Sequence, residues 1–96
     1  MPSEIVWLPG ASRDVARLRD FLTSKNPVAA QRAAKRIIEG VMILQDNPGA
    51  GAPVEALMDY RDLHLSFGSG DYIMRYREEP TRVTIVRVRH SREAGF

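Results

Sequence analysis

Residues 62–77, DLHLSFGSGDYIMRYR, decide the fold because two alternating runs flank a glycine-rich break. Large apolar side chains recur in these runs at every second position: Leu63, Leu65 and Phe67, then Tyr72, Met74 and Tyr76. A period of two is typical of a strand with one buried face. Gly68 and Gly70 in the break indicate a tight turn. This stretch therefore predicts two adjacent antiparallel strands.

A third strand is predicted immediately after this pair. Residues 78–81, Glu-Glu-Pro-Thr, are a turn signal. Residues 83–88 are apolar on both sides apart from Thr84 and Arg87, which is the pattern of a central strand. Because the connections are short, the three strands should form an antiparallel meander.

The N-terminal half predicts one strand and two helices. Residues 4–8 are β-branched and aromatic and favour a strand. Pro9 can close this strand and can also open the next element, because proline is tolerated in the first turn of a helix. From about Ala11 the apolar residues change to a helical period: Ala11, Val15, Leu18 and Leu22, widened by Phe21. A second helix should begin at Asn26-Pro27, because asparagine caps exposed amides and proline fits the first helical position.

The second helix should end at residues 46–49, Asp-Asn-Pro-Gly, and Gly40 within it should weaken it by about 1 kcal/mol relative to alanine. Its apolar side carries Ala30, Ala33, Ala34, Ile37, Val41 and Leu44. Residues 49–59 are expected to be a connecting loop. The order β-α-α-β-β-β predicts one two-layer α+β domain over residues 1–96, with a helical hairpin on an antiparallel sheet and the N-terminal strand at a sheet edge.

Composition excludes several classes of protein. The 96 residues contain no cysteine, so a disulfide framework and thiolate metal ligation are impossible. The two histidines, His64 and His90, are far apart in sequence, which argues against a structural zinc site. We expect no metal and no cofactor. Without a signal-peptide pattern or a run of about 20 apolar residues, we expect a cytoplasmic protein with no membrane partner.

The cations are mostly arginine, although the net charge is only +2. Twelve of the 14 are arginines, and those from residue 61 onward are Arg61, Arg75, Arg77, Arg82, Arg87, Arg89 and Arg92. The planar guanidinium suits carboxylates and phosphates, so an acidic partner, protein or nucleic acid, is one interpretation. The alternative is that these arginines solvate a sheet face and pair with nearby acidic residues.

Several short motifs occur along nearly the whole chain. They are Trp7 followed by Pro9-x-Ala11-x-x-Asp14-Val15, Asn26-Pro27-x-Ala29-Ala30, Leu44-x-x-x-Pro48, Tyr60-Arg61-x-Leu63, residues 72–76 and residues 86–92. Together they resemble the motifs of the ParE/RelE superfamily of toxins. The order and spacing of these motifs carry the resemblance, because each one alone could arise by chance in an α+β domain.

The resemblance implies a growth-arresting toxin of a type II toxin–antitoxin system, of the kind that stabilises plasmids. Such a toxin is neutralised by a cognate antitoxin with which it forms a hetero-oligomer. ParE-like members inhibit DNA gyrase, whereas RelE-like members enter the ribosomal A site and cleave mRNA. The leading hypothesis is a gyrase-directed toxin, the second an mRNA endonuclease, and the third a non-toxic paralogue that only binds antitoxin.

The nuclease hypothesis assigns catalytic roles to four residues. Arg61, Arg75 and Arg89 would supply cations for the phosphorane, and His90 would be base or acid, because histidine titrates near neutral pH. The alternatives are that Arg75 merely lines a sheet face and that His90 bonds a backbone carbonyl. The chain also departs from RelE-like enzymes, since it has only two lysines and no tyrosine after the last strand.

The gyrase hypothesis needs a recognition surface and no active site. We assign target binding to Arg75, Arg89, His90, Arg92 and Phe96, together with the C-terminal segment 91–96. Trp7 is either an anchor under the helical hairpin or part of an apolar edge that antitoxin covers. Asp14 is interpreted as a partner of the helix dipole in the first turn and not as a catalytic acid.

Overall fold

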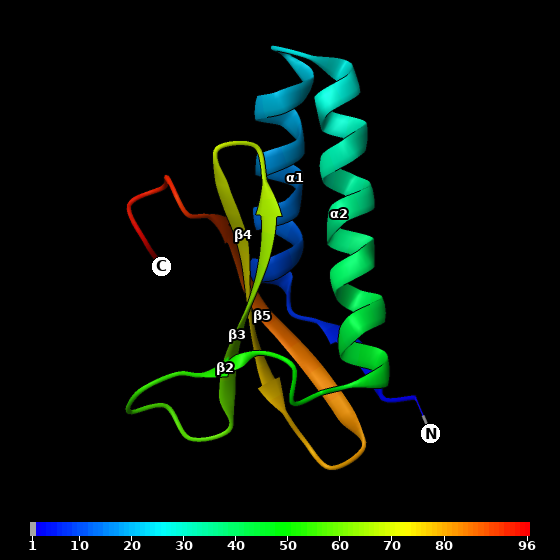
Figure 1. The fold of residues 1–96 in the computed structure, drawn as a ribbon, viewed down its shortest axis with the longest axis vertical. Helices are drawn as coiled ribbons and strands as arrows, with labels where there is room; N and C mark the ends of the chain where they lie inside the picture. Colours follow the sequence, from blue (N-terminus) through cyan, green and yellow to red (C-terminus); the bar gives the residue numbers. More distant parts are fainter. Residues whose placement is uncertain (1) are drawn as a thin grey trace.

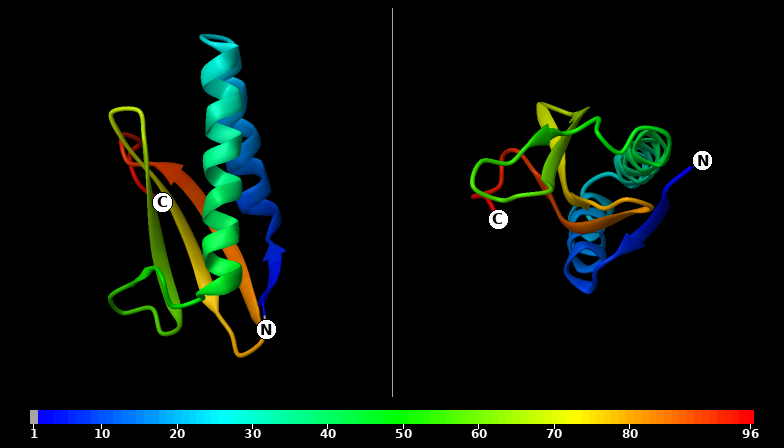
Figure 2. Two further views of the ribbon diagram at one scale, coloured as in Figure 1. Left: turned by 45° about the vertical axis from the view of Figure 1, so that its right-hand side comes forward. Right: turned by 90° about the horizontal axis from the view of Figure 1, so that it is seen from below.

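The computed structural model describes residues 2–96 and shows two layers (Figures 1 and 2). Helices α1 (Pro9–Thr23) and α2 (Pro27–Asp46) form an antiparallel hairpin that covers one face of a five-stranded sheet. The strands are β1 (Glu4–Trp7), β2 (Ala52–Pro53), β3 (Tyr60–Phe67), β4 (Gly70–Glu78) and β5 (Arg82–His90). The predicted α+β class, the layers and the order of the main elements are confirmed.

The strands lie in the order β1-β5-β4-β3-β2. Strands β3, β4 and β5 form the predicted antiparallel meander. Strand β1 pairs with β5 in parallel, with Glu4 opposite Arg82, so β1 is an edge strand and β5 is internal. The short strand β2, opposite Arg61 and Asp62, lies in the segment predicted to be a plain loop. Two residues are too few to produce a recognisable period.

The two helices differ in how their N-termini are capped. Asn26 caps α2 as predicted, because its Oδ1 accepts hydrogen bonds from the backbone N–H groups of Val28 (3.1 Å) and Ala29 (3.3 Å). Helix α1 begins at Pro9, the proline expected to be able to open it, two residues before the apolar helical period starts at Ala11, and it has no side-chain cap. Asp14 therefore lies beyond the first turn, and its interpretation as a first-turn partner of the helix dipole was wrong.

The core lies between the helical hairpin and the sheet. The predicted strand residues Leu65, Tyr72, Met74 and Tyr76 are buried there, as are Leu18, Ile37 and Leu44 of the helices. Two helix residues assigned to the apolar side are exposed, Ala34 and Phe21, the latter to 60%. Both lie on helix faces that no strand covers.

A β-bulge in β5 determines which face its side chains occupy. Arg75 of β4 lies opposite Arg87, whereas the next residue, Tyr76, lies opposite Ile85, so Val86 is an extra residue. Side chains alternate between the faces of a sheet, and the bulge interrupts this alternation. Consequently Ile85 and Val88 both reach the core although they are three positions apart.

Tyr76 connects the core to the loop before β3. Its hydroxyl donates to the carbonyl oxygen of Pro48 (2.6 Å) and accepts from the N–H of Gly51 (2.9 Å). Burial raises the pKa of Tyr76 above its ordinary value. Tyr76→Phe should lower the free energy of unfolding by about 1–2 kcal/mol, because both backbone groups lose their partner. Urea unfolding of the two proteins measures this difference, and Tyr60→Phe at a partly exposed tyrosine is the control.

Candidate recognition surface

Arg75 forms a two-point ion pair on the sheet face that the helices leave open. Its Nε lies 2.9 Å from Oδ1 of Asp62 and its Nη2 lies 3.0 Å from Oδ2. The two residues are directly opposite each other on β4 and β3. The hydrogen bonds to the Asp62 carboxylate raise the pKa of Arg75. The arginine is thus held in one orientation.

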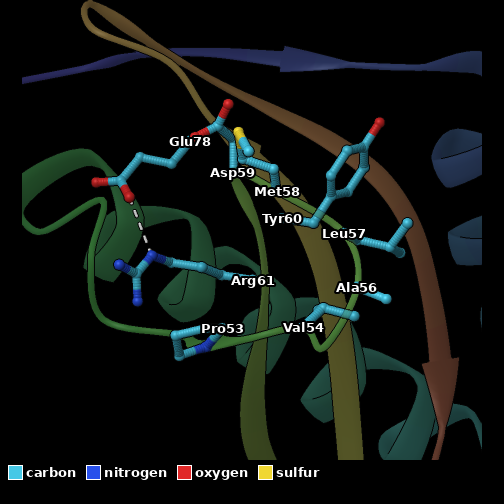
Figure 3. A pocket seen from close by; sticks show the side chains of 9 residues that line it. All are labelled: Pro53, Val54, Ala56, Leu57, Met58, Asp59, Tyr60, Arg61 and Glu78. Carbon is cyan, nitrogen blue, oxygen red and sulfur yellow. Dashed lines mark hydrogen bonds and ion pairs between the residues drawn. The ribbon is translucent and has the colours of Figure 1, made fainter.

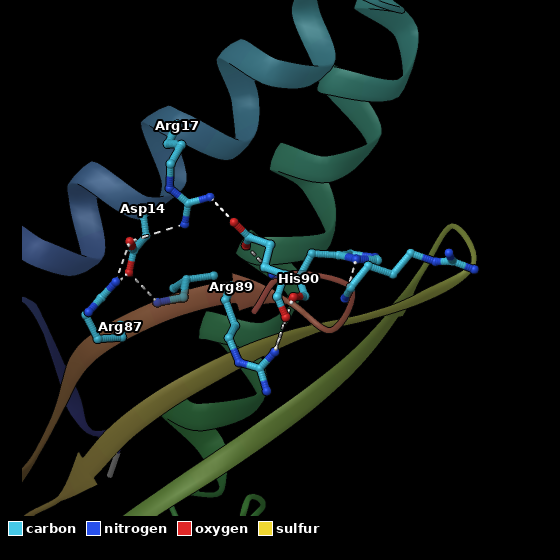
Figure 4. Close-up of polar contacts among 8 residues, drawn as sticks. Asp14, Arg17, Arg87, Arg89 and His90 are labelled. Atoms are coloured by element: carbon cyan, nitrogen blue, oxygen red, sulfur yellow. Dashed lines mark hydrogen bonds and ion pairs between the residues drawn. The ribbon is translucent and has the colours of Figure 1, made fainter. Parts of the chain in front are cut away.

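Asp14 of α1 forms the equivalent pair with Arg87 of β5. Arg87 donates from Nε to Oδ2 (2.7 Å) and from Nη2 to Oδ1 (3.2 Å), and the N–H of Val88 also donates to Oδ2 (2.9 Å). Figure 4 shows Asp14 between Arg87 and Arg17, whose Nη2 lies 3.3 Å from Oδ1. Burial raises the pKa of Asp14, but the hydrogen bonds from Arg87, Val88 and Arg17 outweigh it and hold the pKa below its usual value. The carboxylate therefore stays charged although it is only 5% exposed.

These two pairs form one charged row across the sheet, which consists of Asp62, Arg75, Arg87 and Asp14. Arg75 and Arg87 are direct cross-strand neighbours, an arrangement that is unfavourable for like charges. A carboxylate at each end of the row offsets this repulsion. The sequence indicated Arg75 but not the role of Arg87 or Asp14. The signal in the sequence that could have indicated Asp14 is its helical spacing, which places it on the buried side of α1 with Ala11 and Leu18.

Phe96 lies over the centre of the row. The guanidinium carbons of three arginines approach its ring centroid at 4.6 Å (Arg75), 5.1 Å (Arg89) and 5.6 Å (Arg87). We call these three residues the arginine cluster. Within residues 2–96, no carboxylate forms an ion pair with Arg89, and its buried Nε has no hydrogen-bond partner. Three of the predicted target-binding positions, Arg75, Arg89 and Phe96, are thus together.

His90 lies apart from this cluster, because consecutive strand residues point to opposite faces. Its ring packs edge-on against the buried Tyr72, with centroids 5.4 Å apart. Its Nε2 lies 3.0 Å from the carbonyl oxygen of Phe67, and its Nδ1 accepts from the N–H of Arg92 (3.3 Å). These contacts indicate the tautomer with the proton on Nε2, and they match the alternative that His90 bonds a backbone carbonyl.

Arg61 is also separate from the arginine cluster. It lies opposite Tyr76 on the side of β3 that carries the core residues. Its Nε pairs with Oε1 of Glu78 (2.9 Å), and its Nη1 donates to the carbonyl oxygen of Gly51 (2.8 Å). Figure 3 shows this pair beside a shallow pocket. Of the four candidate nuclease residues, the fold brings together Arg75 and Arg89 and separates both from Arg61 and His90.

The family follows from the sequence match. The sequence model of the ParE toxin of the type II toxin–antitoxin system parDE matches residues 5–95. This chain belongs to the ParE toxin family. The match extends from β1 to the segment after β5, so it includes the arginine cluster and the charged row.

Relatives of this ParE-family chain carry RelE as well as ParE names. Toxin RelE3 of Caulobacter vibrioides (strain ATCC 19089 / CIP 103742 / CB 15) is 38% identical over 88% of the chain and 90% of the relative. Toxin RelE2 of the same organism is 32% identical over 93% and 96%, respectively. The solved structure of the chromosomal ParDE TA system from P. aeruginosa contains a similar chain, with 25% identity and a TM-score of 0.73 over 92% of this chain and 95% of that one.

The ParE-family chain also exposes apolar surface, on α2 at Val28, Ile38 and Met42 and in two further places. A groove of about 570 Å³ runs between the second half of α1 and the β3–β4 turn, and it is lined by Leu18, Phe21, Leu22, Phe67 and Tyr72, with His90 and Arg92 at its edge. In the loop before β3, Met58 is 86% exposed, and its neighbours Ala56 and Asp59 adopt positive φ angles of 66° and 67°. The sequence indicated neither surface.

Trp7 faces the helices and is only partly buried. It packs against the core from the edge strand β1, which fits the interpretation as an anchor under the hairpin. Contact with antitoxin through Trp7 stays a prediction. Among residues 2–96, no three histidine, aspartate or glutamate side chains are arranged to hold a metal ion. No helix in the same range has the length and hydropathy to cross a membrane.

Proposed function

We propose that this chain is a toxin that inhibits DNA gyrase by binding to it and that a cognate antitoxin neutralises it. The observation that carries this proposal is the set of contacts that the His90 ring makes. Both of its ring nitrogens are bonded to backbone groups, and it lies on the opposite side of β5 from the arginine cluster. General acid–base catalysis needs a group within reach of the proton that it transfers. This geometry supports a binding surface over a nuclease site.

The arginine cluster has properties expected of a recognition surface. Asp62 and Asp14 hold two of its arginines by two-point pairs, so little side-chain entropy is lost when a partner binds. Aromatic and arginine side chains are also enriched at protein interfaces. We assign target binding to the arginine cluster and Phe96, and we retain Arg92 and His90 as predicted contacts at the neighbouring groove.

The cognate antitoxin is proposed to cover apolar surface. The similar chain in the solved ParDE system supports a partner of this kind. The groove beside Phe21 is apolar and open, and such a surface suits the apolar face of a partner helix. Its proximity to the segment 91–96 would let antitoxin affect the target-binding surface as well.

The second candidate is a ribosome-dependent mRNA endonuclease. Two observations favour it: the relatives named Toxin RelE3 and Toxin RelE2, and the gathering of three guanidinium groups, which could hold a phosphate. The third candidate, a non-toxic paralogue that binds only antitoxin, is distinguished by whether expression of the chain alone stops growth.

Pulse labelling after induction without antitoxin tests the proposal. We expect an early DNA-damage response while amino-acid incorporation continues. We also expect the purified chain to inhibit supercoiling by purified gyrase. An early collapse of protein synthesis with intact DNA would instead support the nuclease and return His90 to the list of catalytic candidates.

Arg75→Ala should weaken gyrase inhibition about tenfold, equal to about 1.4 kcal/mol of binding free energy. The reason is that it removes one guanidinium of the cluster and frees the Asp62 carboxylate to repel an acidic group. Arg75 is partly exposed on the open face, so the fold should remain intact. The supercoiling assay measures inhibition, circular dichroism checks folding, and Arg32→Gln on the exposed side of α2 is the control. Full inhibition by a folded Arg75→Ala protein would remove this residue from the surface.

A further inference from the structure

The charge balance of the arginine cluster limits what it can bind. Asp62 neutralises Arg75, and Asp14 neutralises Arg87. Arg17 and Glu93, which lie beside Asp14, pair with each other and add no net charge. Among the side chains, three arginines and two carboxylates therefore leave one positive charge, and it belongs to Arg89.

Arg89 is the member of the arginine cluster whose hydrogen-bonding capacity is least used. Its Nη1 makes only long contacts with the carbonyl oxygens of His90 (3.4 Å) and Glu93 (3.5 Å), and its buried Nε makes none. A buried donor without a partner costs about 1–3 kcal/mol. The cluster is thus prepared to accept one further hydrogen-bond acceptor at Arg89.

Phe96 covers this donor without satisfying it. The ring face attracts the three cations by about 0.5–1 kcal/mol each at exposed sites, but a ring offers no strong acceptor. Gly95, at a φ of 107°, turns the chain back over the sheet, and glycine adopts this conformation without strain. Phe96 itself is 42% exposed, so a competing group can reach the ring and displace it.

We propose that the arginine cluster is a binding site for a single carboxylate side chain of a partner protein, and that Phe96 covers this site until the partner displaces it. The inference rests on the proposed binding function and specifies the partner group that this surface recognises. It replaces the direct target contact proposed for Phe96 by a covering role. An acidic residue beside an apolar residue fits best, because the carboxylate reaches Arg89 while the apolar neighbour replaces the Phe96 ring.

The same charges argue against a nucleic acid at this site. Affinity for a phosphate backbone comes from several uncompensated cations, each neutralising one phosphate. Here the one uncompensated cation, Arg89, lies two residues along β5 from Arg87, beside a row that carries two fixed carboxylates, Asp62 and Asp14, which would repel a row of phosphates. A single carboxylate can reach Arg89 and stay clear of both.

Titration of the folded chain, followed through the Nε–H resonances of its arginines by NMR, tests the proposal. The probes are the blocked peptides acetyl-Phe-Glu-amide and acetyl-Phe-Gln-amide, which differ in the carboxylate alone. We expect the glutamate peptide to shift the Arg89 resonance most and the glutamine peptide to shift it little. Equal shifts with both peptides, or no shift at Arg89, would overturn the proposal.

Three variants separate the contributions of Arg89 and Phe96 to binding of the glutamate peptide. Arg89→Gln should weaken binding of the glutamate peptide about tenfold, because it removes the charge-assisted bond. Phe96→Ala should strengthen binding by about twofold to fivefold, because the competing ring is gone. Phe96→Ala changes a partly exposed residue at the end of the described chain, so it tests the proposal even if Arg89→Gln misfolds. Arg32→Gln on α2 is the control, and it should not change the binding of the glutamate peptide.

An RNA titration and a comparison with gyrase inhibition distinguish this inference from the proposed function. A short single-stranded RNA that shifts the same arginines at lower concentration than the glutamate peptide would overturn the carboxylate site. Failure of the glutamate peptide together with inhibition of purified gyrase would reject the inference alone. Binding of the peptide together with unaffected gyrase would reject the proposed target and support the site.

Discussion

Asp14→Ala is expected to lower the free energy of unfolding by about 2–4 kcal/mol. The substitution leaves the buried N–H of Val88 without a partner and removes the carboxylate that holds Arg87. It also brings Arg87 and Arg75, which are cross-strand neighbours, into uncompensated repulsion. Arg87 is partly exposed, so solvent screening limits that part of the loss. Chemical denaturation measures the effect.

Asp20→Ala is the matched control, because Asp20 is an exposed aspartate of the same helix. We expect a change of no more than about 0.5 kcal/mol there. Similar losses at both positions would mean that the Asp14 contacts contribute nothing specific. A further consequence concerns the surface: Asp14→Ala should also broaden the Arg87 Nε–H resonance, because the guanidinium is no longer held.

The contribution of Asp14 to the free energy of unfolding should decrease at acidic pH. The pKa of Asp14 is lower in the folded chain than in the unfolded chain, where aspartate titrates at about 3.9. The stabilisation is therefore complete above the unfolded pKa and is lost as the pH falls through the folded pKa. The stability difference between the native chain and Asp14→Asn should be constant near neutral pH and shrink below about pH 4. A difference that grows on acidification would contradict this sign.

Gly40→Ala is expected to destabilise the chain by about 2–3 kcal/mol, the reverse of what helix propensity predicts. A Cβ at Gly40 would lie 2.6 Å from Cδ1 of Leu65 and 2.8 Å from Sδ of Met74. Both side chains are buried in the core and cannot move away freely. Glycine here allows α2 to approach the sheet closely, and thermal unfolding will show the sign of the effect.

A double-mutant cycle identifies which contact causes the destabilisation by Gly40→Ala. Leu65→Val removes the terminal methyl group that a Cβ at Gly40 would meet first. In that background, Gly40→Ala should cost about half as much, because one of the two overlaps is gone. An unchanged cost would place the strain at Met74 alone. Stabilisation by Gly40→Ala in the native background would contradict the close approach altogether.

Local patterns predicted most of the fold. The alternation in residues 62–77 and the cap at Asn26 correspond to β3, β4 and the start of α2. The short strand β2 could not be predicted in the same way, and for the start of α1 the only local signal was that Pro9 is tolerated in a first turn. Pairing with β3 creates β2, and a hydrogen bond from Leu8 to Ile85 leads β1 directly into α1. Both depend on residues far away in the chain.

The candidate surface was predicted in part. Arginine type and strand alternation indicated Arg75 and Arg89, and the apolar end of the chain indicated Phe96. Asp14 was assigned to the helix dipole, because two of its partners, Arg87 and Val88, lie more than 70 residues away. The bulge at Val86 places Arg87 opposite Arg75, and no periodicity in the sequence indicates a bulge.

The sequence by itself determined the element types, the α+β class, the family resemblance and the excess of arginine. These properties follow from side-chain periodicity, capping and composition, which act between neighbours in the chain. The tertiary structure alone decided that Arg75, Arg87 and Arg89 meet under Phe96 and that His90 and Arg61 do not join them. Ion pairs and close packing depend on distances of a few ångströms between remote residues, and strand register and the bulge set those distances.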